Sequence, residues 1–272
     1  MTGPVTAAGP AAVDGAGAGR VAVKICGVTE PEDAVLSAEL GAGYLGLNFW
    51  PGSPRFVDLG RAQEIAAAVR DYCSDRGHPS HRGLPSHRGH RSQRPAAPGV
   101  QLVGVFVNPT AAAVAETAAA VGLDLLQFSG DEPAAAVRPF AARAIKALRR
   151  HDPAAAAAHA DCWAVLFDAP TADSAGNAAA GAVAATAGME YGGTGRQWDY
   201  AAAAGAAAGA GFARVFLAGG IGPRNVRRVV ATLRPFAVDV CSGVESAPGR
   251  KDPELLRQLF EEVSNGQVSH PA

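Results

Sequence analysis

Short apolar runs alternate along this chain with longer segments of helical pattern, and this alternation constrains the fold more than any other feature. The strand-like runs are Arg20–Cys26, Gly43–Phe49, Val100–Asn108, Leu123–Phe128, Ala141–Leu148, Cys162–Asp168, Ala213–Ala218 and Ala237–Cys241. The clearest helical segments are Pro31–Leu40, Leu59–Tyr72, Thr110–Val121, Asn225–Leu233 and Pro253–Val263. Eight strands that alternate with helices predict an α/β protein of the single-domain (β/α)8, or TIM-barrel, type.

Glycine-rich turns are concentrated late in the chain. An open, doubly wound sheet is the alternative fold, but it places its glycine fingerprint after the first strand. In a (β/α)8 barrel, phosphate sites commonly form after strands 7 and 8, where glycine lets backbone N–H groups approach an anion closely. The residues expected to hold a substrate phosphate are Gly193, Gly195, Gly219, Gly220, Ser242 and Gly243.

Composition divides the chain into a barrel and three peripheral segments. Residues 1–19 consist almost entirely of small residues and proline, which predicts a disordered leader. Residues 20–265 form the expected barrel domain, and residues 266–272 the expected flexible tail. A basic, low-complexity insert at 74–98 interrupts the barrel and repeats the pentapeptide Pro-Ser-His-Arg-Gly. A metal or nucleic-acid site there is an alternative, but a solvated loop is favoured because no organised carboxylate, cysteine or aromatic residue accompanies the basic side chains.

The overall charge and the cysteines restrict the partners and the compartment. The formal net charge is −1, which argues against a general nucleic-acid or membrane-surface role. No apolar stretch approaches the roughly 20 residues of a membrane helix, and Pro4 and Pro10 interrupt any signal-peptide core. Four cysteines lie far apart without a CxxC pair, as expected for reduced thiols. These features predict a cytoplasmic protein.

Catalytic groups of a barrel enzyme lie at the C-terminal ends of its strands. Cys26 ends the first strand-like run and Asp168 the sixth, so a thiol and a carboxylate are the leading acid–base pair. Alternatively, Cys26 is a small buried apolar residue and Asp168 a helix cap. The sequence contains no Ser-His-Asp order, metal-ligand cluster or phosphate-binding Walker loop, so neither a metal nor a cofactor is expected. Arg55 follows the second strand, where a guanidinium suits a substrate carboxylate.

Together these residues resemble the phosphoribosylanthranilate isomerase family of tryptophan biosynthesis. The likeness covers residues 20–263. Its matching pieces are Lys24-Ile25-Cys26-Gly27, Ser53-Pro54-Arg55-Phe56-Val57, Val105-Phe106-Val107-Asn108, Gly192-Gly193-Thr194-Gly195, Leu217-Ala218-Gly219-Gly220 and Asp239-Val240-Cys241-Ser242-Gly243-Val244-Glu245, followed by the closing turn Pro248-Gly249-Arg250-Lys251-Asp252.

The resemblance implies an Amadori rearrangement of N-(5-phospho-β-D-ribosyl)anthranilate to 1-(2-carboxyphenylamino)-1-deoxyribulose 5-phosphate. It implies that Asp168 is the general acid that opens the ribose ring and Cys26 the general base that removes the C2 proton. Arg55 would hold the anthranilate carboxylate and the late glycine loops the phosphate. Lys24 shares the inward parity of Cys26 on its strand and would favour the thiolate. A monomer or homodimer is expected, with a small phosphorylated substrate, no cofactor, and no nucleic-acid or membrane partner.

One motif departs from the family pattern, and two other functions remain as alternatives. After the fourth strand the family reads Gln-Leu-His-Gly, whereas this chain has Gln127-Phe128-Ser129-Gly130, which removes a histidine near the substrate.

The histidine-pathway isomerase performs the same rearrangement on an aminoimidazole ribotide, but it uses an aspartate where this chain has Cys26. A non-catalytic phosphate-binding protein of the same fold is disfavoured by the joint presence of Cys26, Asp168 and Arg55.

Overall fold

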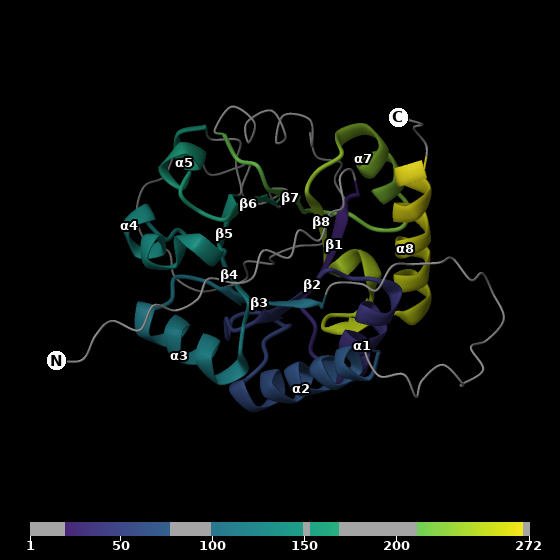
Figure 1. The fold of residues 1–272 in the computed structure, drawn as a ribbon, viewed down its shortest axis with the longest axis horizontal. Helices are drawn as coiled ribbons and strands as arrows, with labels where there is room; N and C mark the ends of the chain where they lie inside the picture. Colours follow the sequence, from purple (N-terminus) through teal and green to yellow (C-terminus); the bar gives the residue numbers. More distant parts are fainter. Residues whose placement is uncertain (1–19, 77–98, 149–152, 169–210, 269–272) are drawn as a thin grey trace.

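Eight parallel strands close into a barrel in the computed structural model, which confirms the predicted (β/α)8 fold (Figure 1). The structure describes residues 20–76, 99–148, 153–168 and 211–268. The barrel strands are β1 (Ala22–Cys26), β2 (Tyr44–Asn48), β3 (Gln101–Phe106), β4 (Leu125–Phe128), β5 (Ala144–Leu148), β6 (Ala164–Phe167), β7 (Val215–Leu217) and β8 (Ala237–Val240). Each strand pairs with its neighbour in sequence, and β8 pairs with β1 to close the ring.

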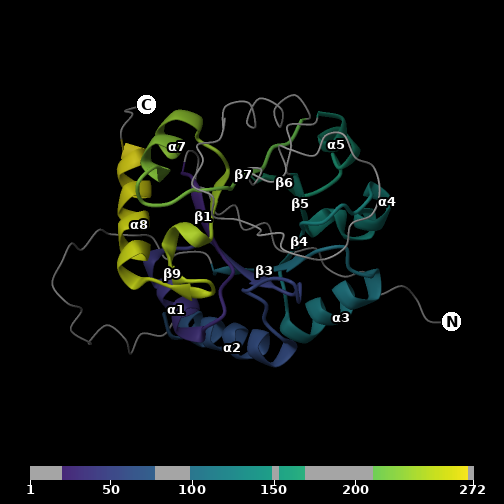
Figure 2. The ribbon, with the colours of Figure 1, turned by 180° about the vertical axis from the view of Figure 1, so that it is seen from behind.

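Helices follow most of the described strands and cover the outside of the barrel (Figures 1 and 2). They are α1 (Pro31–Leu40), α2 (Leu59–Arg76), α3 (Ala111–Val121), α4 (Ala134–Val137) with the 3-10 turn η2 (Arg138–Arg143), α5 (Pro153–Ala158), α7 (Val226–Leu233) and α8 (Pro253–Val268). Two of them show the local signals that define their ends. Gly41 ends α1 in a left-handed conformation, and the Thr110 side chain caps α3 by accepting a hydrogen bond from the backbone N–H of Ala113.

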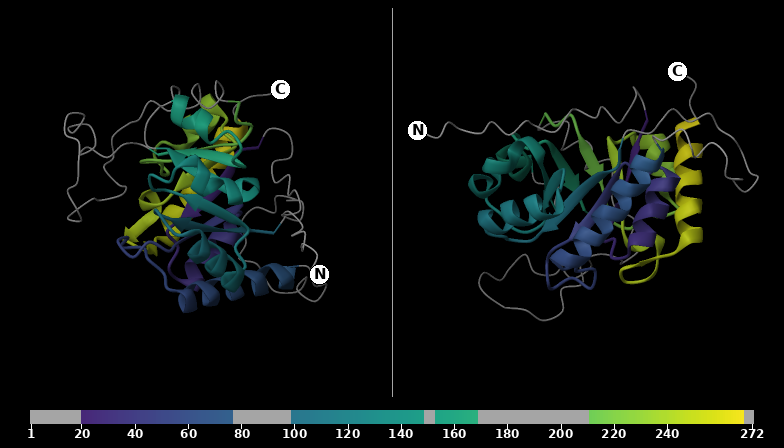
Figure 3. Two further views of the ribbon diagram at one scale, coloured as in Figure 1. Left: turned by 90° about the vertical axis from the view of Figure 1, so that its left-hand side faces the viewer. Right: turned by 60° about the horizontal axis from the view of Figure 1, so that its bottom comes forward.

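A short antiparallel hairpin, β9 (Glu245–Ala247) and β10 (Arg250–Lys251), follows β8 and the 3-10 turn η4 (Ser242–Val244). The sequence pattern predicted only a turn there. The hairpin lies at the same end of the barrel as the C-terminal ends of the strands, and α1, α2 and α8 lie side by side behind it (Figures 2 and 3). It therefore places Glu245 and Lys251 near the ends of β1 and β8.

Two predicted boundaries were wrong by a few residues. Helix α2 continues to Arg76 and so takes up the first residues of the expected insert 74–98. Helix α8 continues to Val268, beyond the expected start of the tail at 266. Its last turn is held because Gln267 donates a 2.9 Å hydrogen bond to the carbonyl oxygen of Val21. Residues 1–19, most of the insert, and residues 169–210, including Gly193 and Gly195, lie outside the described residues.

The core consists of two layers, as expected when strand side chains alternate between opposite faces. Between the strands and the helices lies one apolar cluster, to which Ile25, Leu45 and Leu126 belong. A second cluster fills the inside of the barrel and contains Tyr44 and Phe216, whose ring centroids are 5.3 Å apart. The barrel is thus filled at its N-terminal end, which leaves the C-terminal end for a cavity.

Candidate active site

A cavity opens at the C-terminal end of the barrel and collects most of the described residues that the sequence singled out. Six of those residues line it: Cys26, Arg55, Asp168, Gly219, Gly220 and Ser242. The remaining lining residues are Gly27, Asn48, Trp50, Ser53, Val105, Val107, Gln127, Ser129, Ala147, Leu166, Ala218, Ile221, Asp239 and Cys241. The wall of the cavity therefore combines apolar surface with polar groups at defined points, as is typical of a small-molecule site.

Cys26 ends β1 with its side chain inside the barrel, next to the buried ion pair of Lys24 and Asp239. Lys24 is fully buried, and its Nζ lies 2.9 Å from Oδ1 of Asp239. A hydrogen bond from the Cys241 thiol lowers the pKa of Cys26 most, burial opposes that effect, and the positive charge of Lys24 adds to it. The resulting pKa is about 7, so a large fraction of Cys26 is thiolate at neutral pH.

Asp168 follows β6 directly, and its half-buried side chain lines the cavity. Its backbone N–H donates a 3.1 Å hydrogen bond to the carbonyl oxygen of Leu148, so the barrel ladder continues through this residue. The backbone position of Asp168 is therefore set by the sheet.

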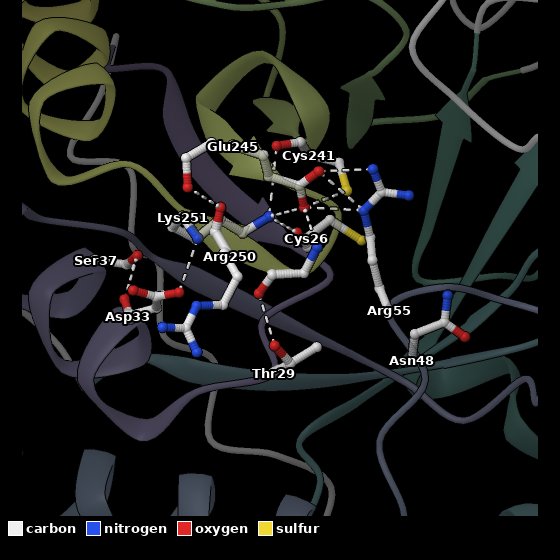
Figure 4. Close-up of polar contacts among 12 residues, drawn as sticks. Cys26, Thr29, Asp33, Ser37, Asn48, Arg55, Cys241, Glu245, Arg250 and Lys251 are labelled. Carbon is white, nitrogen blue, oxygen red and sulfur yellow. Dashed lines mark hydrogen bonds and ion pairs between the residues drawn. The ribbon is translucent and has the colours of Figure 1, made fainter.

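Arg55 is held by a compact turn after β2. Within this turn the Ser53 hydroxyl accepts hydrogen bonds from the backbone N–H of Arg55 and from the Asn48 side chain, both at 3.1 Å. The guanidinium then meets Glu245 along one edge, with Nε 2.9 Å from Oε1 and Nη2 2.6 Å from Oε2 (Figure 4). Among the described residues, Nη1 of Arg55 has no hydrogen-bond acceptor, so the second edge of the guanidinium is not paired with a carboxylate of this part of the chain.

Glu245 connects Arg55 to a second buried cation, Lys251. The Nζ of Lys251 donates to Glu245 at 2.8 Å, to the Cys26 carbonyl oxygen at 2.7 Å and to the Cys241 carbonyl oxygen at 3.4 Å (Figure 4). Burial works against ionisation of Glu245, but its bonds to Arg55 and Lys251 outweigh burial and lower its pKa. Two cations thus share one carboxylate, so these three side chains together carry one net positive charge.

Glu245 and Lys251 have no predicted role from the sequence, although both lie in motifs that match the family. The only local signal was their charge, which the neighbouring Arg250 and Asp252 share.

The described glycine turns follow β7 and β8, as predicted. Gly219 and Gly220 both have positive φ angles, of 89° and 64°, which only glycine adopts readily. The Asn225 side chain fixes the turn by accepting from the Gly222 N–H and donating to the Gly220 carbonyl oxygen. Gly243 does not line the cavity. A Cβ on it would lie 2.1 Å from the Ile221 carbonyl oxygen, so this glycine allows the two turns to pack against each other.

Gln127 and Ser129 occupy the wall after β4, where the sequence departs from the family motif. Gln127 is buried, and its Nε2 donates a 3.0 Å hydrogen bond to the Ser129 hydroxyl. Its Oε1 has no hydrogen-bond partner among the described residues. Both side chains line the cavity, so a polar acceptor is present where the family histidine is missing.

The described residues contain neither a cluster of metal ligands nor a membrane-spanning helix. No group of three or more His, Cys, Asp or Glu side chains in the described part of the chain is placed to hold a metal ion. None of the described helices is both long and apolar enough to cross a membrane.

Comparison with known proteins gives a consistent result. The family model described as N-(5'-phosphoribosyl)anthranilate (PRA) isomerase matches residues 81–262. The N-(5'-phosphoribosyl)anthranilate isomerase of Citrifermentans bemidjiense is 38% identical over 89% of this chain and 96% of its own length.

Solved structures agree with the sequence comparison. Phosphoribosyl anthranilate isomerase from Thermotoga maritima superposes with a TM-score of 0.67 at 31% identity, covering 90% of this chain and 98% of its own. A further phosphoribosyl anthranilate isomerase, solved in complex with reduced 1-(o-carboxyphenylamino)-1-deoxyribulose 5-phosphate, superposes with a TM-score of 0.62 at 28% identity, again covering 90% and 98%.

Proposed function

The chain belongs to the N-(5'-phosphoribosyl)anthranilate isomerase family, and from this premise we propose that Cys26 is the general base and Asp168 the general acid of its reaction. The protein is an isomerase of tryptophan biosynthesis that acts on a small molecule. The proposed substrate is N-(5-phospho-β-D-ribosyl)anthranilate. The single observation that carries the assignment of roles is the meeting of Cys26, Asp168 and Arg55 around one cavity at the C-terminal end of the barrel.

Ring opening is the step assigned to Asp168. The protonated carboxyl group donates its proton to the ribose ring oxygen while the bond between C1 and that oxygen breaks. The nitrogen lone pair forms a C1=N double bond, so the leaving electron pair ends as the C4 hydroxyl. The position of Asp168 supports this role, because the residue follows an entirely buried strand and lines the cavity.

Proton removal from C2 is the step assigned to Cys26. The thiolate takes the C2 proton, the C–H electron pair forms C1=C2, and the C1=N electron pair returns to nitrogen. The neutral enolamine then tautomerises to the 2-ketone, so the overall change is an isomerisation without an external oxidant or reductant. The lowered pKa of Cys26 supports the role, because a thiol with an ordinary pKa is mostly protonated at neutral pH.

The two ends of the substrate are assigned to two separate anion sites. Arg55 uses its Nε edge for Glu245, and its other edge remains for the anthranilate carboxylate. Trp50, Val105 and Val107 offer apolar surface near that residue for the aromatic ring. The phosphate is assigned to the turns after β7 and β8, with Gly219, Gly220 and Ser242 lining the cavity and Gly243 closing the turn behind them. Gly193 and Gly195 complete the proposed phosphate site.

The remaining expectations are part of the same proposal. We place the enzyme in the cytoplasm, as a monomer or homodimer, with no nucleic-acid partner. The four cysteines, all without a disulfide, fit a reducing compartment. The barrel domain 20–265 is expected to carry the activity without a contribution from the leader or the insert 74–98.

The test is a fluorescence assay in which phosphoribosylanthranilate is generated in situ and its disappearance is followed. The enzyme is expected to consume the substrate far above the uncatalysed rate. Replacement of either group, Cys26→Ala or Asp168→Asn, is expected to lower kcat about 10²–10⁴-fold. Asp131→Asn is the matched control, because Asp131 is an exposed carboxylate that does not line the cavity. A kcat near the parent value in either variant would remove that residue from the mechanism.

The histidine-pathway rearrangement is tested separately by supplying the corresponding aminoimidazole ribotide. Arg55 and the apolar wall beside it suit an anthranilate ring with its carboxylate, so turnover of the aminoimidazole compound is expected to be absent or far slower. Comparable turnover of both compounds would show a dual-function isomerase.

A further inference from the structure

The barrel closes so that the only two cysteines lining the described cavity come together. Strand β1 pairs with β8 in register from Ala22 with Ala237 to Ile25 with Val240. Cys26 and Cys241 are each the next residue along, at the C-terminal ends of two adjacent parallel strands. Adjacent strands lie about 4.8 Å apart, and disulfides form across Cα separations of about 4.4–6.8 Å. The backbone separation thus lies within the range that a disulfide requires.

Buried contacts hold this pair of residues in place. One atom, Nζ of Lys251, binds the carbonyl oxygens of both Cys26 and Cys241, at 2.7 and 3.4 Å. Gly27 permits the close approach of the two strand ends, since a Cβ at that position would lie 3.1 Å from the Cys241 sulfur. Both side chains reach into the same space, where the Cys241 thiol also donates a 3.8 Å hydrogen bond to Oε1 of Glu245 (Figure 4).

We propose that Cys26 and Cys241 are an oxidation site, at which a peroxide converts the two thiols into a reversible disulfide that blocks the general base. The effect on activity rests on the proposed function of Cys26, whereas the disulfide itself does not. Both residues line the cavity, so a small oxidant reaches them by the path that the substrate takes.

The chemistry balances in two steps. The Cys26 thiolate attacks one oxygen of hydrogen peroxide, the O–O bond breaks, and hydroxide leaves as water after taking a proton, so that Cys26 becomes a sulfenic acid. The Cys241 sulfur then attacks the sulfenic sulfur, the S–O bond breaks, and the oxygen leaves as a second water with the proton of the Cys241 thiol. Two thiols are oxidised by two electrons and one peroxide is reduced to two waters.

The other two cysteines provide internal controls. Cys162 is buried behind the barrel wall, and burial raises its pKa to about 11. Cys73 lies on α2, where it packs against the outer apolar cluster. Neither lines the cavity, so both are expected to react with peroxide later than Cys26.

The experiment treats the full-length, reduced protein with hydrogen peroxide, blocks the remaining thiols, and identifies peptides without reduction. Trypsin releases Cys26 and Cys241 on separate peptides, residues 25–55 and 229–250. These two peptides are expected to be found joined. The residual activity of the treated protein is expected to equal the fraction without the link, and dithiothreitol is expected to restore full activity. The variant Cys73→Ser is expected to behave like the parent.

Cys241→Ser is the informative variant, with its own untreated activity as the reference. It is expected to give no linked peptide, and its loss of activity is expected to become irreversible as Cys26 proceeds to the sulfinic acid. Sulfinic acid at Cys26 in the parent without any linked peptide would overturn the proposal. So would dithiothreitol recovery in Cys241→Ser equal to that of the parent. A linked peptide with undiminished activity would support the disulfide and overturn the general-base role of Cys26 instead.

Discussion

The guanidinium of Arg55 meets the carboxylate of Glu245 along a single edge, with Nε 2.9 Å from Oε1 and Nη2 2.6 Å from Oε2. Both side chains are largely buried, and Lys251 binds the same carboxylate at 2.8 Å. An arginine can make two bidentate contacts, one on each edge of its planar fork. Glu245 therefore fixes the orientation of Arg55 and leaves the other edge of the guanidinium for the proposed substrate carboxylate.

Loss of the negative charge at Glu245 is expected to weaken substrate binding. Glu245→Gln removes a charge-assisted bidentate pair worth about 1.5–3 kcal/mol, so KM is expected to rise about tenfold or more while kcat changes less. Steady-state kinetics by substrate fluorescence measure both constants. The control is Glu30→Gln, which breaks ion pairs to Arg61 and Arg250 outside the cavity and is expected to leave KM unchanged. An unaltered KM in Glu245→Gln would refute the orienting role.

A methyl group at Gly27 is expected to displace Arg55. The residue has a φ of 67°, and a Cβ there would lie 2.5 Å from Cδ of Arg55. Gly27→Ala is therefore expected to raise KM and also to lose about 1–2 kcal/mol of stability from backbone strain. Gly211→Ala is the matched control, because Gly211 has a φ of 78° and no described atom within 4 Å of its added Cβ. It should lose similar stability in urea unfolding and leave KM unchanged.

The Cys26 thiol is expected to titrate near neutral pH. Its pKa is lowered to about 7, so its rate of alkylation by iodoacetamide should rise with pH through that value and level off above it. Cys241→Ala removes the hydrogen bond that contributes most to the shift, and should move the titration to higher pH. The alkylated peptide 25–55, followed by mass spectrometry, reports on Cys26 alone. A titration that does not move in Cys241→Ala would contradict the assigned cause.

The buried pair of Lys146 and Glu132 is expected to stabilise the turn after β4. Lys146 Nζ lies 2.6 Å from Glu132 and also binds the carbonyl oxygens of Phe128 and Gly130. Burial disfavours the ionised Glu132, but Lys146 outweighs burial and lowers its pKa. Because the folded pKa is below the unfolded one, this stability is present above the unfolded pKa and is lost as pH falls through the folded pKa.

Glu132→Gln leaves a buried cation without its partner and is expected to cost about 3–5 kcal/mol in the free energy of unfolding at neutral pH. The variant should also lose less stability than the parent when the pH is lowered through the acidic range. Urea unfolding at several pH values measures both effects. The exposed pair of Glu64 and Arg61 supplies the control, since Glu64→Gln should change the unfolding free energy little.

Much of the fold could be predicted because its signals are local. The alternation of apolar runs and helical segments defined all eight strands, and the positions of Cys26, Asp168 and Arg55 followed from where those runs end. The ends of α2 and α8 were placed too early. For α8 the reason is a tertiary contact, because the bond from Gln267 to Val21 holds the last turn beyond the local pattern. The hairpin formed by β9 and β10 was missed, since it is too short to show an alternation of its own.

The sequence by itself determined which residues face the inside of the barrel and which stand at its C-terminal rim, because strand periodicity and strand ends are properties of a few consecutive residues. Only the tertiary structure decided how those residues pair. Closure of β8 onto β1 brings Asp239 to Lys24 and Cys241 to Cys26, and it brings Glu245 to Arg55, a residue 190 positions away. The order of the chain does not specify these contacts, which depend on the ring of strands being complete.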